Sequence, residues 1–327
     1  MKPIRLMTYR NGSAIPTLPE QSLSNSSELF QVYGQTPGYT PILVVASIDE
    51  TPIAKLQAVI RRSVRIFPPS LIKRCEIFGI GEYFSDIHPQ EKLFGLMLEH
   101  LTNEVLKDCF LIEFRNLPTA LFGYKHFRHN GYFPINWIRV YNSLHNLSPE
   151  ERLESKRKRQ INRSFKYGVT LQEAQTEEDK KTFLQLLKLH YSSKLRKHFP
   201  DTKLFQLLTQ GSTTGSISRI FTVKYKNIII GGSFCMYSCD RAYLCFSFGL
   251  RKTFSWLHPN TMAIWAALID AYQRGYPHFE FIDAGLPFQK VGYRNFILSF
   301  GGKQVSTRRW FRFRWEWINK LFTKLYQ

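Results

Sequence analysis

Residues 258–285 read HPNTMAIWAALIDAYQRGYPHFEFIDAG, and this stretch decides the fold that the sequence predicts. Pro259 stands where a helix begins, because proline favours the first helical position, and Gly275 stands where that helix ends. The short apolar run that follows, HFEFID, has the length and composition of a strand. The stretch therefore predicts a long helix and then a strand, with Asp283 at the strand's end.

Strands and helices alternate on both sides of this stretch. Their order predicts a mixed α/β sheet with helices on both faces. In chain order the elements predicted around it are a strand at 168–174, helices at 176–191 and 202–211, a hairpin at 218–238, a strand at 241–250, a helix at 288–302 and a strand at 303–315.

The first half of the chain repeats this order, although sequence identity between the halves is not evident. The repeat predicts two α/β domains, 1–147 and 168–327, joined by a basic helix at 148–167. The predicted elements of the first half are a helix at 24–34, a hairpin at 41–64, a strand at 72–84, a helix at 88–107, a strand at 109–114, a helix at 120–132 and a strand at 135–144.

The succession of hairpin, strand, long helix, strand, helix and strand resembles the GNAT acyltransferase fold. Twin copies joined by a basic segment resemble the Fem-like and BioF2-like (CelD-type) branch of that superfamily. The resemblance implies two tandem GNAT-like domains and a bacterial acyltransferase of polysaccharide or envelope synthesis, with the second domain carrying most of the active site. It rests on NGYFPINWIRVYNSL (130–144), SKRKRQINRSFKYGV (155–169), AYQRGYPHFEFIDAG (271–285) and GYRNFILSFGG (292–302).

The resemblance implies one of two acyl donors. Acyl-CoA, with acetyl-CoA as the common case, is the first, although residues 250–260 lack the glycines that often hold its pyrophosphate. Aminoacyl-tRNA is the alternative, although Phe296-Ile297 stands where tRNA-using members often have Phe-Lys. We expect an acyl-CoA or similar thioester as donor, and as acceptor a small-molecule or lipid-linked amine such as an envelope or polysaccharide precursor.

Three residues are predicted to be catalytic. Asp283 ends a strand, where open α/β sheets place their ligands, and can orient or deprotonate the amine; alternatively it caps the turn that follows. Tyr293 can protonate a leaving group, or it packs in the core. His190, next to Tyr191 at the end of the predicted helix 176–191, can accept a proton, or it is a partly buried helix residue.

Four residues are predicted to bind the cofactor. Arg251 precedes the long helix, and Asn260 lies at its start, where backbone amides can meet a phosphate. Lys290 and Arg294 are one helical turn apart and share a face, so both can approach an anion; a solvated Arg294 is the alternative. The sequence has no cluster of His, Cys or acidic residues with metal-ligand spacing, and we expect no metal.

Positive charge is concentrated in the second half. Residues 1–150 carry 15 basic and 13 acidic side chains, and residues 151–327 carry 30 and 12, which gives net charges of +2 and +18. Residues 156–166 alone hold six Lys or Arg. We interpret this run as a helix that rests Leu153, Ile161 and Phe165 on a domain and turns its charges toward a phosphate-bearing donor. A tRNA partner fits the charge; a non-enzymatic nucleic-acid-binding or structural protein is the alternative, and we expect no DNA partner.

The end of the chain alternates aromatic and basic residues. Residues 315–327 predict an amphipathic helix that lies on an anionic membrane surface or docks on its own domain. No apolar stretch reaches the length of a membrane span, and residues 1–16 lack a secretory signal. The five cysteines, without a CxxC pair, predict reduced core thiols. We therefore expect a cytoplasmic protein, with the inner membrane face as a peripheral location.

Overall fold

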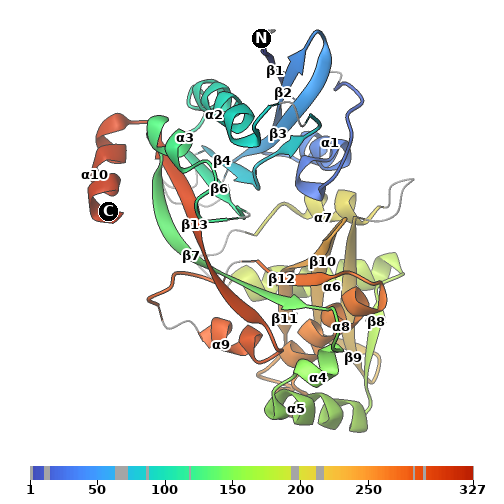
Figure 1. Cartoon of the computed structure of the whole chain (residues 1–327). Helices are drawn as coiled ribbons and strands as arrows, with labels where there is room; N and C mark the ends of the chain where they lie inside the picture. The colour runs from blue at the N-terminus through green and yellow to red at the C-terminus, as the bar shows by residue number, and fades with distance from the viewer. Residues whose placement is uncertain are drawn as a thin grey trace. The chain divides into compact units, whose positions relative to one another are not determined.

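The computed structural model describes residues 3–10, 15–62, 73–85, 88–117, 119–192, 199–210, 217–282, 284–289 and 292–326. Contacts divide the chain into two compact units (Figure 1). Unit 1 comprises residues 1–137 and 306–327, and unit 2 comprises residues 138–305. The sequence predicts a second domain that runs to residue 327 and a linker at 148–167, whereas the structure groups residues 306–327 with unit 1 and places 148–167 inside unit 2.

Unit 1 is built on a sheet with the order β1-β2-β3-β4-β6-β13, and β5 pairs with β3. Neighbouring strands are antiparallel except β4 and β6, which are parallel. Its elements are β1 (Arg5–Arg10), η1 (Leu23–Asn25), α1 (Ser27–Gln35), β2 (Tyr39–Ile48), β3 (Thr51–Arg62), β4 (Lys73–Phe78), β5 (Glu82–Tyr83), α2 (Gln90–Val105), β6 (Leu111–Arg115), α3 (Tyr124–His129), the C-terminal part of β13 (Lys303–Phe313) and α10 (Glu316–Tyr326).

Unit 2 repeats this plan with the order β8-β9-β10-β11-β12-β7. Again all neighbours are antiparallel except one parallel pair, β11 and β12. The predicted repeat of element order is thus visible in strand pairing. The elements are β7 (Phe133–Ser143), α4 (Pro149–Arg152), α5 (Ser155–Lys166), β8 (Val169–Glu173), α6 (Glu177–Ser192), α7 (Thr202–Thr209), β9 (Ser218–Tyr225), β10 (Ile228–Ser238), β11 (Arg241–Gly249), η3 (Ser255–Leu257), α8 (Pro259–Gln273), β12 (His278–Phe281) and α9 (Gly292–Leu298).

Local sequence signals set the ends of these elements. The hairpins turn at Asp49-Glu50 and at Lys226-Asn227, and all four residues have positive φ, as two-residue hairpin turns require. Thr176 caps α6 by accepting a hydrogen bond from the Asp179 amide at 3.1 Å. Pro259 opens α8, and Gly275 follows its end with φ +77°. The predicted turns and helix ends are confirmed at these positions.

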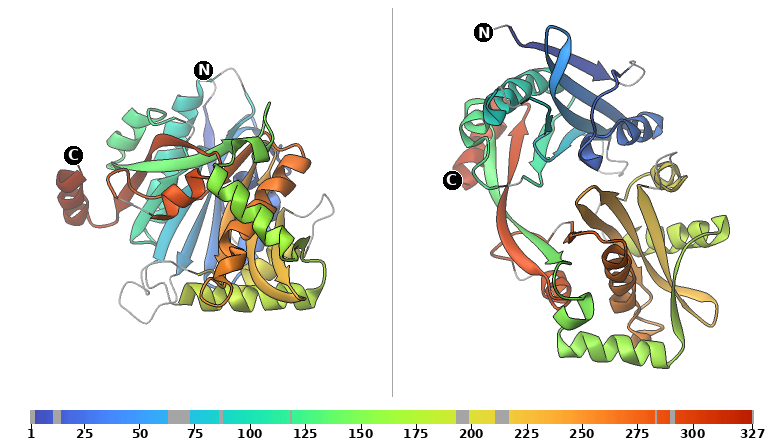
Figure 2. Two further views of the ribbon diagram at one scale, coloured as in Figure 1. Left: turned by 90° about the horizontal axis from the view of Figure 1, so that it is seen from below. Right: turned by 45° about the vertical axis from the view of Figure 1, so that its right-hand side comes forward.

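The core of unit 2 lies between α8 and the sheet. α8 is apolar on nearly every side and packs on β10 and β11, while α6 covers the opposite face of the same strands (Figure 2). Gly232 of β10 permits this packing, because a Cβ there would lie 2.4 Å from the Phe221 carbonyl oxygen and 2.8 Å from the Phe183 ring. Phe183 of α6 can therefore rest directly on the strand backbone.

Each sheet is completed by a strand that is distant in sequence. β7 follows the helix α3 of unit 1, yet its residues 140–143 pair with β12 of unit 2. β13 follows α9 of unit 2, yet its residues 310–313 pair with β6 of unit 1. Trp310 of β13 is fully buried and stacks on Phe127, with ring centroids 4.6 Å apart. The C-terminal strand thus supplies part of the core of unit 1.

We find no helix among the described residues that is long and apolar enough to cross a membrane. The same residues contain no group of His, Cys, Asp or Glu that is able to hold a metal ion. All five cysteines are described and are free thiols; Cys75, Cys109 and Cys235 are buried.

Trp310→Ala should destabilise the protein by about 3–5 kcal/mol, because it leaves a cavity between β13 and α3. The matched control is Trp317→Ala on α10, whose side chain is exposed, and which should change stability by less than about 0.5 kcal/mol. Urea unfolding of the full chain measures both. Equal effects of the two substitutions would contradict the assignment of β13 to the core of unit 1.

Candidate functional site

The parallel strands of unit 2 separate partway along their length. The register of β11 with β12 ends at the pair Leu244 and Phe281, and the Ile282 amide reaches the Leu244 carbonyl at 3.4 Å. β11 continues to Gly249 and remains paired with β10. No described residue of β12 pairs with residues 245–249, which we call the splayed edge.

The described strands of unit 1 show no counterpart of the splayed edge. Its parallel strands β4 and β6 stay paired from Arg74 and Leu111 to Phe78 and Arg115, and the Gly79 amide extends the ladder to the Arg115 carbonyl at 2.8 Å. Backbone groups at the end of the parallel pair are therefore not bonded to β12 in unit 2, whereas in unit 1 they are used within the sheet.

An extra residue, Cys245, accompanies the separation. The register between β10 and β11 shifts there, since Phe234 pairs with Phe246 and Cys235 pairs with Leu244. Such a bulge bends the strand and redirects the backbone groups that follow it. The Ser247 amide then donates to the hydroxyl of Tyr191 from α6, rather than to a neighbouring strand.

Tyr191 is the titratable group next to the splayed edge. Its ring packs against Phe246 and Phe199 at centroid distances of 5.5 and 6.0 Å. Burial raises the pKa of the Tyr191 hydroxyl to about 12, although the hydrogen bond from Ser247 acts in the opposite direction. Tyr191 is therefore protonated near neutral pH and can donate a proton or a hydrogen bond.

His190 precedes Tyr191 at the end of α6. Its imidazole is half-buried, with ring centroids 5.5 Å from Tyr191 and 6.3 Å from Phe248 of β11. The structure thus places this predicted catalytic residue beside the splayed edge. Its role as a proton acceptor stays a prediction.

The start of α8 lies directly against the end of β11. A Cβ at Gly249 would approach the Asn260 amide nitrogen to 2.5 Å, so glycine is required for this contact. The Asn260 side-chain oxygen is buried and has no hydrogen-bond partner among the described residues. Arg251 and Lys252, between β11 and η3, are exposed.

These residues fit a phosphate-bearing donor in part. The exposed Arg251 and Lys252 and the amide at the start of α8 suit a pyrophosphate. Six other amides of this segment bond to its own carbonyls, so fewer backbone donors face outward than in a glycine-rich loop. These six belong to Arg251, Phe254, Leu257, His258, Thr261 and Met262.

Arg294 of α9 has a different role from the one predicted. Its buried guanidinium donates to the carbonyls of Ala284 at 3.0 Å, Pro287 at 3.2 Å and Leu286. It therefore fixes the loop after β12, which borders the splayed edge, and is a positioning residue in place of the predicted phosphate ligand or solvated side chain. Tyr293 is half-buried and packs against the core of unit 2, as the alternative interpretation expects.

Asp283 and Lys290 lie outside the described residues. Their predicted roles, in catalysis and in donor binding respectively, stay predictions. Both flank the loop 284–289, which Arg294 holds.

A buried ion cluster braces the paired part of the strands. Glu280 of β12 accepts two hydrogen bonds from Arg139 of β7, both at 2.7 Å, and one from Arg241 of β11 at 3.1 Å. Removing one partner of such a cluster leaves a buried charge uncompensated, so the three strands are held together here. The sequence signal was the acid at the centre of HFEFID, which our prediction did not use.

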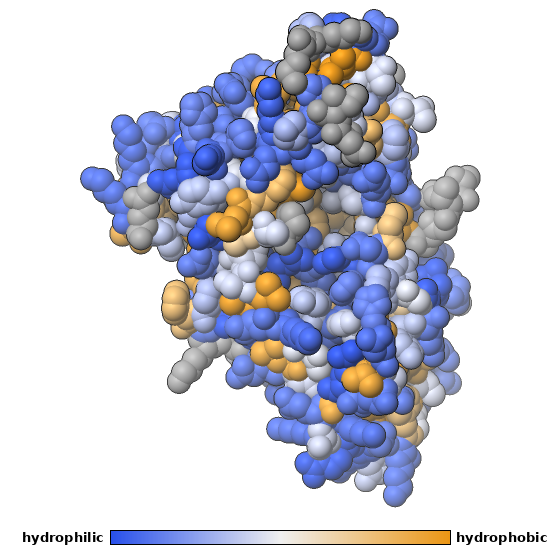
Figure 3. All heavy atoms as spheres, in the orientation of Figure 1, coloured by the Kyte–Doolittle hydropathy of each residue, from blue (hydrophilic) through white to orange (hydrophobic). Residues whose placement is uncertain are grey.

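The basic run identified in the sequence forms α5, which packs on unit 2 by one side. Ile161 is buried, and the Ser164 hydroxyl donates to the Leu257 carbonyl at 2.8 Å. The surface over α5, at the lower end of the view in Figure 3, is mainly hydrophilic. Phe165, which we expected to rest on the domain, is 45% exposed, so that part of the interpretation was wrong.

Exposed aromatic rings lie among these basic residues. Tyr167 and Trp256 are in edge contact at 5.1 Å, and the Arg163 guanidinium lies over the Tyr167 ring at 5.6 Å. These three residues form a basic and aromatic surface next to η3. The sequence alone could not bring Trp256 to this surface, because it is distant in sequence from α5.

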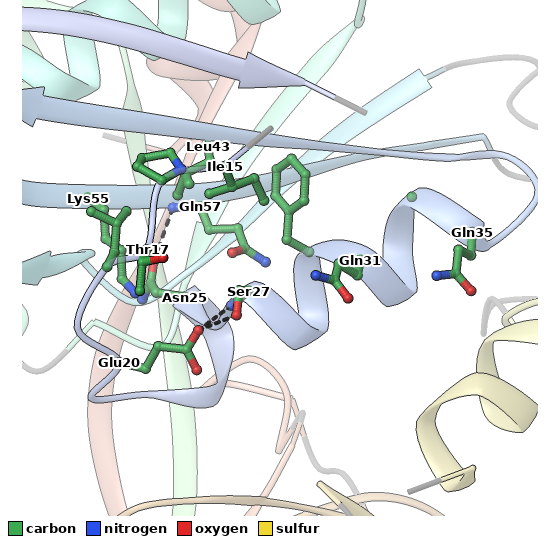
Figure 4. A pocket seen from close by; sticks show the side chains of 14 residues that line it. Ile15, Thr17, Glu20, Asn25, Ser27, Gln31, Gln35, Leu43, Lys55 and Gln57 are labelled. Atoms are coloured by element: carbon green, nitrogen blue, oxygen red, sulfur yellow. Dashed lines mark hydrogen bonds between the residues drawn. The ribbon is translucent and has the colours of Figure 1, made fainter. Parts of the chain in front are cut away.

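A separate cavity of about 740 Å³ lies in unit 1, against α1, β2 and β3 (Figure 4). Its lining holds two charged residues, and each bonds to groups of unit 1. Glu20 accepts from the Ser27 amide at 2.7 Å, and the Lys55 ammonium lies 3.1 Å from the buried Glu82 carboxylate. The lining therefore combines the Glu20 carboxylate and uncharged polar groups with apolar ones, which suits a polar ligand. Its polar members are Thr17, Asn25, Ser27, Gln31, Gln35 and Gln57.

The sequence prediction missed this cavity. Its signal was the pair of polar residues, Lys55 and Gln57, inside the apolar strand PIAKLQAVI. Both side chains are buried, and polar residues at buried strand positions need partners or a ligand.

His258, at the start of α8, should make stability pH-dependent. Burial, then the charges of Arg163 and Arg157, lowers the pKa of His258 in the folded protein. Folding therefore favours the neutral ring, and the stability it contributes is lost as the pH falls below the ordinary value of 6.5.

His258→Asn, which tolerates the positive φ of 47° at this position, should reduce the loss of thermal stability on acidification. Thermal melts across this pH range measure the effect, with His129→Asn on α3 as the control that should follow the wild type. Coinciding pH profiles for His258→Asn and the wild type would refute the prediction.

Comparison with known proteins identifies the fold. Residues 153–290 match the family model described as an acetyltransferase (GNAT) domain, which is less than half of the chain. None of the curated proteins compared with this sequence matches it.

Solved structures extend the likeness to both units. FemX is 11% identical with a TM-score of 0.62, and the match covers 93% of this chain and 94% of that one. The C-terminal domain of a putative lysylphosphatidylglycerol synthetase from Agrobacterium fabrum is 12% identical, with a TM-score of 0.54 over 82% and 83%. A tandem GNAT protein from the clavulanic acid biosynthesis pathway is 10% identical, with a TM-score of 0.53 over 86% and 85%. At such identities the likeness shows the fold, a Fem-like tandem GNAT fold.

Proposed function

We propose, from the premise of a tandem GNAT acyltransferase fold, that the protein transfers an acyl group from acyl-CoA or a similar thioester to an amine. The observation that carries this proposal is the splayed edge with its Ser247 amide and the adjoining Tyr191 hydroxyl. A preorganised amide next to a protonated acid is what the developing oxyanion and the leaving thiolate of such a reaction require.

The residues of unit 2 divide the chemistry between them. When bound, the donor supplies an activated acyl carbonyl. The Ser247 amide, which donates to the Tyr191 hydroxyl in the structure, can donate to that carbonyl oxygen once the hydroxyl turns toward the sulfur. The amine nitrogen then forms its bond to the acyl carbon, and the carbon–sulfur bond breaks. Tyr191 can give its proton to the departing sulfur, and His190 can take the proton that the amine loses. Arg294 keeps the neighbouring loop in place throughout.

The donor's phosphates would meet the start of α8. Arg251 and Lys252 supply charge, and Asn260 supplies its backbone amide at the start of the helix. As acceptor we propose an amine on an amino sugar or an envelope precursor, including a lipid-linked one. The polar cavity of unit 1 suits the sugar or peptide part of such a molecule.

The surface around α5 favours a second candidate donor. Exposed aromatic rings such as Tyr167 and Trp256 beside an arginine are typical of surfaces that bind single-stranded or unpaired bases. An aminoacyl-tRNA would use the same amide and tyrosine for its ester. The alternative that is not an enzyme is a basic protein that binds nucleic acid.

A thermal-shift comparison of CoA, acetyl-CoA and aminoacylated tRNA separates these functions. A donor at about a hundred times its Kd should stabilise the protein by about 2.7 kcal/mol. We expect this stabilisation with the CoA species. Stabilisation by aminoacylated tRNA alone would favour the second candidate donor. If no ligand stabilises the protein, both proposed transferase functions are contradicted.

Charge reversal tests the proposed phosphate contacts. The double variant Arg251→Glu and Lys252→Glu should raise the apparent Kd for CoA about tenfold or more, as measured from the CoA-dependent thermal shift. The control reverses two exposed lysines elsewhere in unit 2, Lys181 and Lys203, and should bind like the wild type. If both double variants bind CoA equally weakly, the effect comes from net charge and the proposed phosphate contacts are contradicted.

Tyr191→Phe should lower kcat for acyl transfer by about a hundredfold and leave KM for the donor nearly unchanged, because it removes the hydroxyl that protonates the leaving group. Tyr272→Phe, at an exposed tyrosine of α8, is the matched control. Steady-state kinetics with acetyl-CoA and a panel of amines measure both. An unchanged kcat would exclude Tyr191 as the acid.

A further inference from the structure

The C-terminal helix α10 is fixed on unit 1 by one face. Asn319 is buried, and its side chain donates to the Gly131 carbonyl at 2.6 Å and accepts from the Phe313 amide at 3.2 Å. The Phe322 ring lies over Phe133 and against Phe313, at centroid distances of 6.2 and 4.9 Å. These contacts determine which side chains of the helix face outward.

The outward face carries an apolar stripe. Trp317, Leu321 and Leu325 are spaced by four residues, so they align along the helix, and their side chains are 67%, 50% and 66% exposed. Trp315, just before the helix, is 53% exposed. Aligned exposed rings and leucines of this kind mark an interaction surface rather than ordinary scattered apolar residues.

Positive charge borders the stripe. Lys320 and Lys324 are exposed and lie three residues after Trp317 and Leu321, on the same side of the helix. The helix has one acid, Glu316, and its carboxylate is paired with Arg312 at 2.9 Å. Residues 306–327 hold six basic side chains and one acidic side chain, a net charge of +5.

We propose that α10 docks the protein on the surface of an anionic phospholipid bilayer. Trp317, Leu321 and Leu325 enter the boundary between headgroups and acyl chains, and Lys320 and Lys324 pair with headgroup phosphates. The helix has 11 residues and a length of about 16 Å, so it lies in the plane of the interface. A second copy of the chain fits less well, because it would bring the same lysines together.

Vesicle co-sedimentation tests this proposal with the full chain. The protein should bind vesicles of equal parts phosphatidylglycerol and phosphatidylcholine, and bind pure phosphatidylcholine at least tenfold more weakly. Trp317→Gln with Leu325→Gln should weaken binding to the anionic vesicles by about tenfold or more. The matched control, Leu121→Gln with Leu189→Gln, changes equally exposed leucines and should bind like the wild type.

The charge contribution has its own variants. Lys320→Gln and Lys324→Gln should each weaken anionic-vesicle binding about fivefold, whereas Lys181→Gln and Lys203→Gln should not. Light scattering without vesicles measures whether the protein is a monomer or a dimer. The proposal is overturned if the wild type binds neither kind of vesicle or binds both equally. It is also overturned if the stripe variant binds normally, or if the wild type is a dimer that the stripe substitutions disperse.

Discussion

β11 keeps its hydrogen bonds to β10 on one side while it loses those to β12 on the other, and the extra residue at Cys245 accompanies this change. The two sheets have the same strand order and the same single parallel pair, so this interruption is what distinguishes them chemically. Unit 2 gains a backbone amide and a tyrosine at its splayed edge, whereas the uninterrupted ladder of unit 1 uses those groups for cohesion. A one-residue irregularity thus accompanies the one difference in strand pairing between the two copies of the plan.

Several polar groups of unit 2 serve to keep that edge rigid. The Arg294 guanidinium donates hydrogen bonds to carbonyls of the loop after β12, and Glu280 accepts from Arg139 and Arg241 across three strands. Preorganised dipoles assist a reaction only when they do not have to move during it. The net charge of the second half of the chain is therefore divided between buried structural cations and the exposed ones around α5 and η3.

Local features of this fold could be predicted from sequence, and non-local ones could not. The turns at Asp49-Glu50 and Lys226-Asn227 and the start of α8 at Pro259 follow from nearby residues. The partner of β13 depends on a strand far away, so residues 306–327 were predicted in the wrong unit. The role of Arg294 depends on carbonyls that only the folded loop brings together. Tyr191 was noticed with His190, but the bulge that gives it an amide partner has no sequence signature.

The exchange of closing strands has a consequence for how the chain is made. Glu113 of β6 meets Arg309 of β13, 196 residues later, so the ribosome delivers almost all of unit 2 before β6 acquires its neighbour. Until then β6 is a sheet edge with unpaired backbone groups, and such edges attract other chains. Nascent unit 1 therefore keeps the edge of β6 open until residues 310–313 have been synthesised.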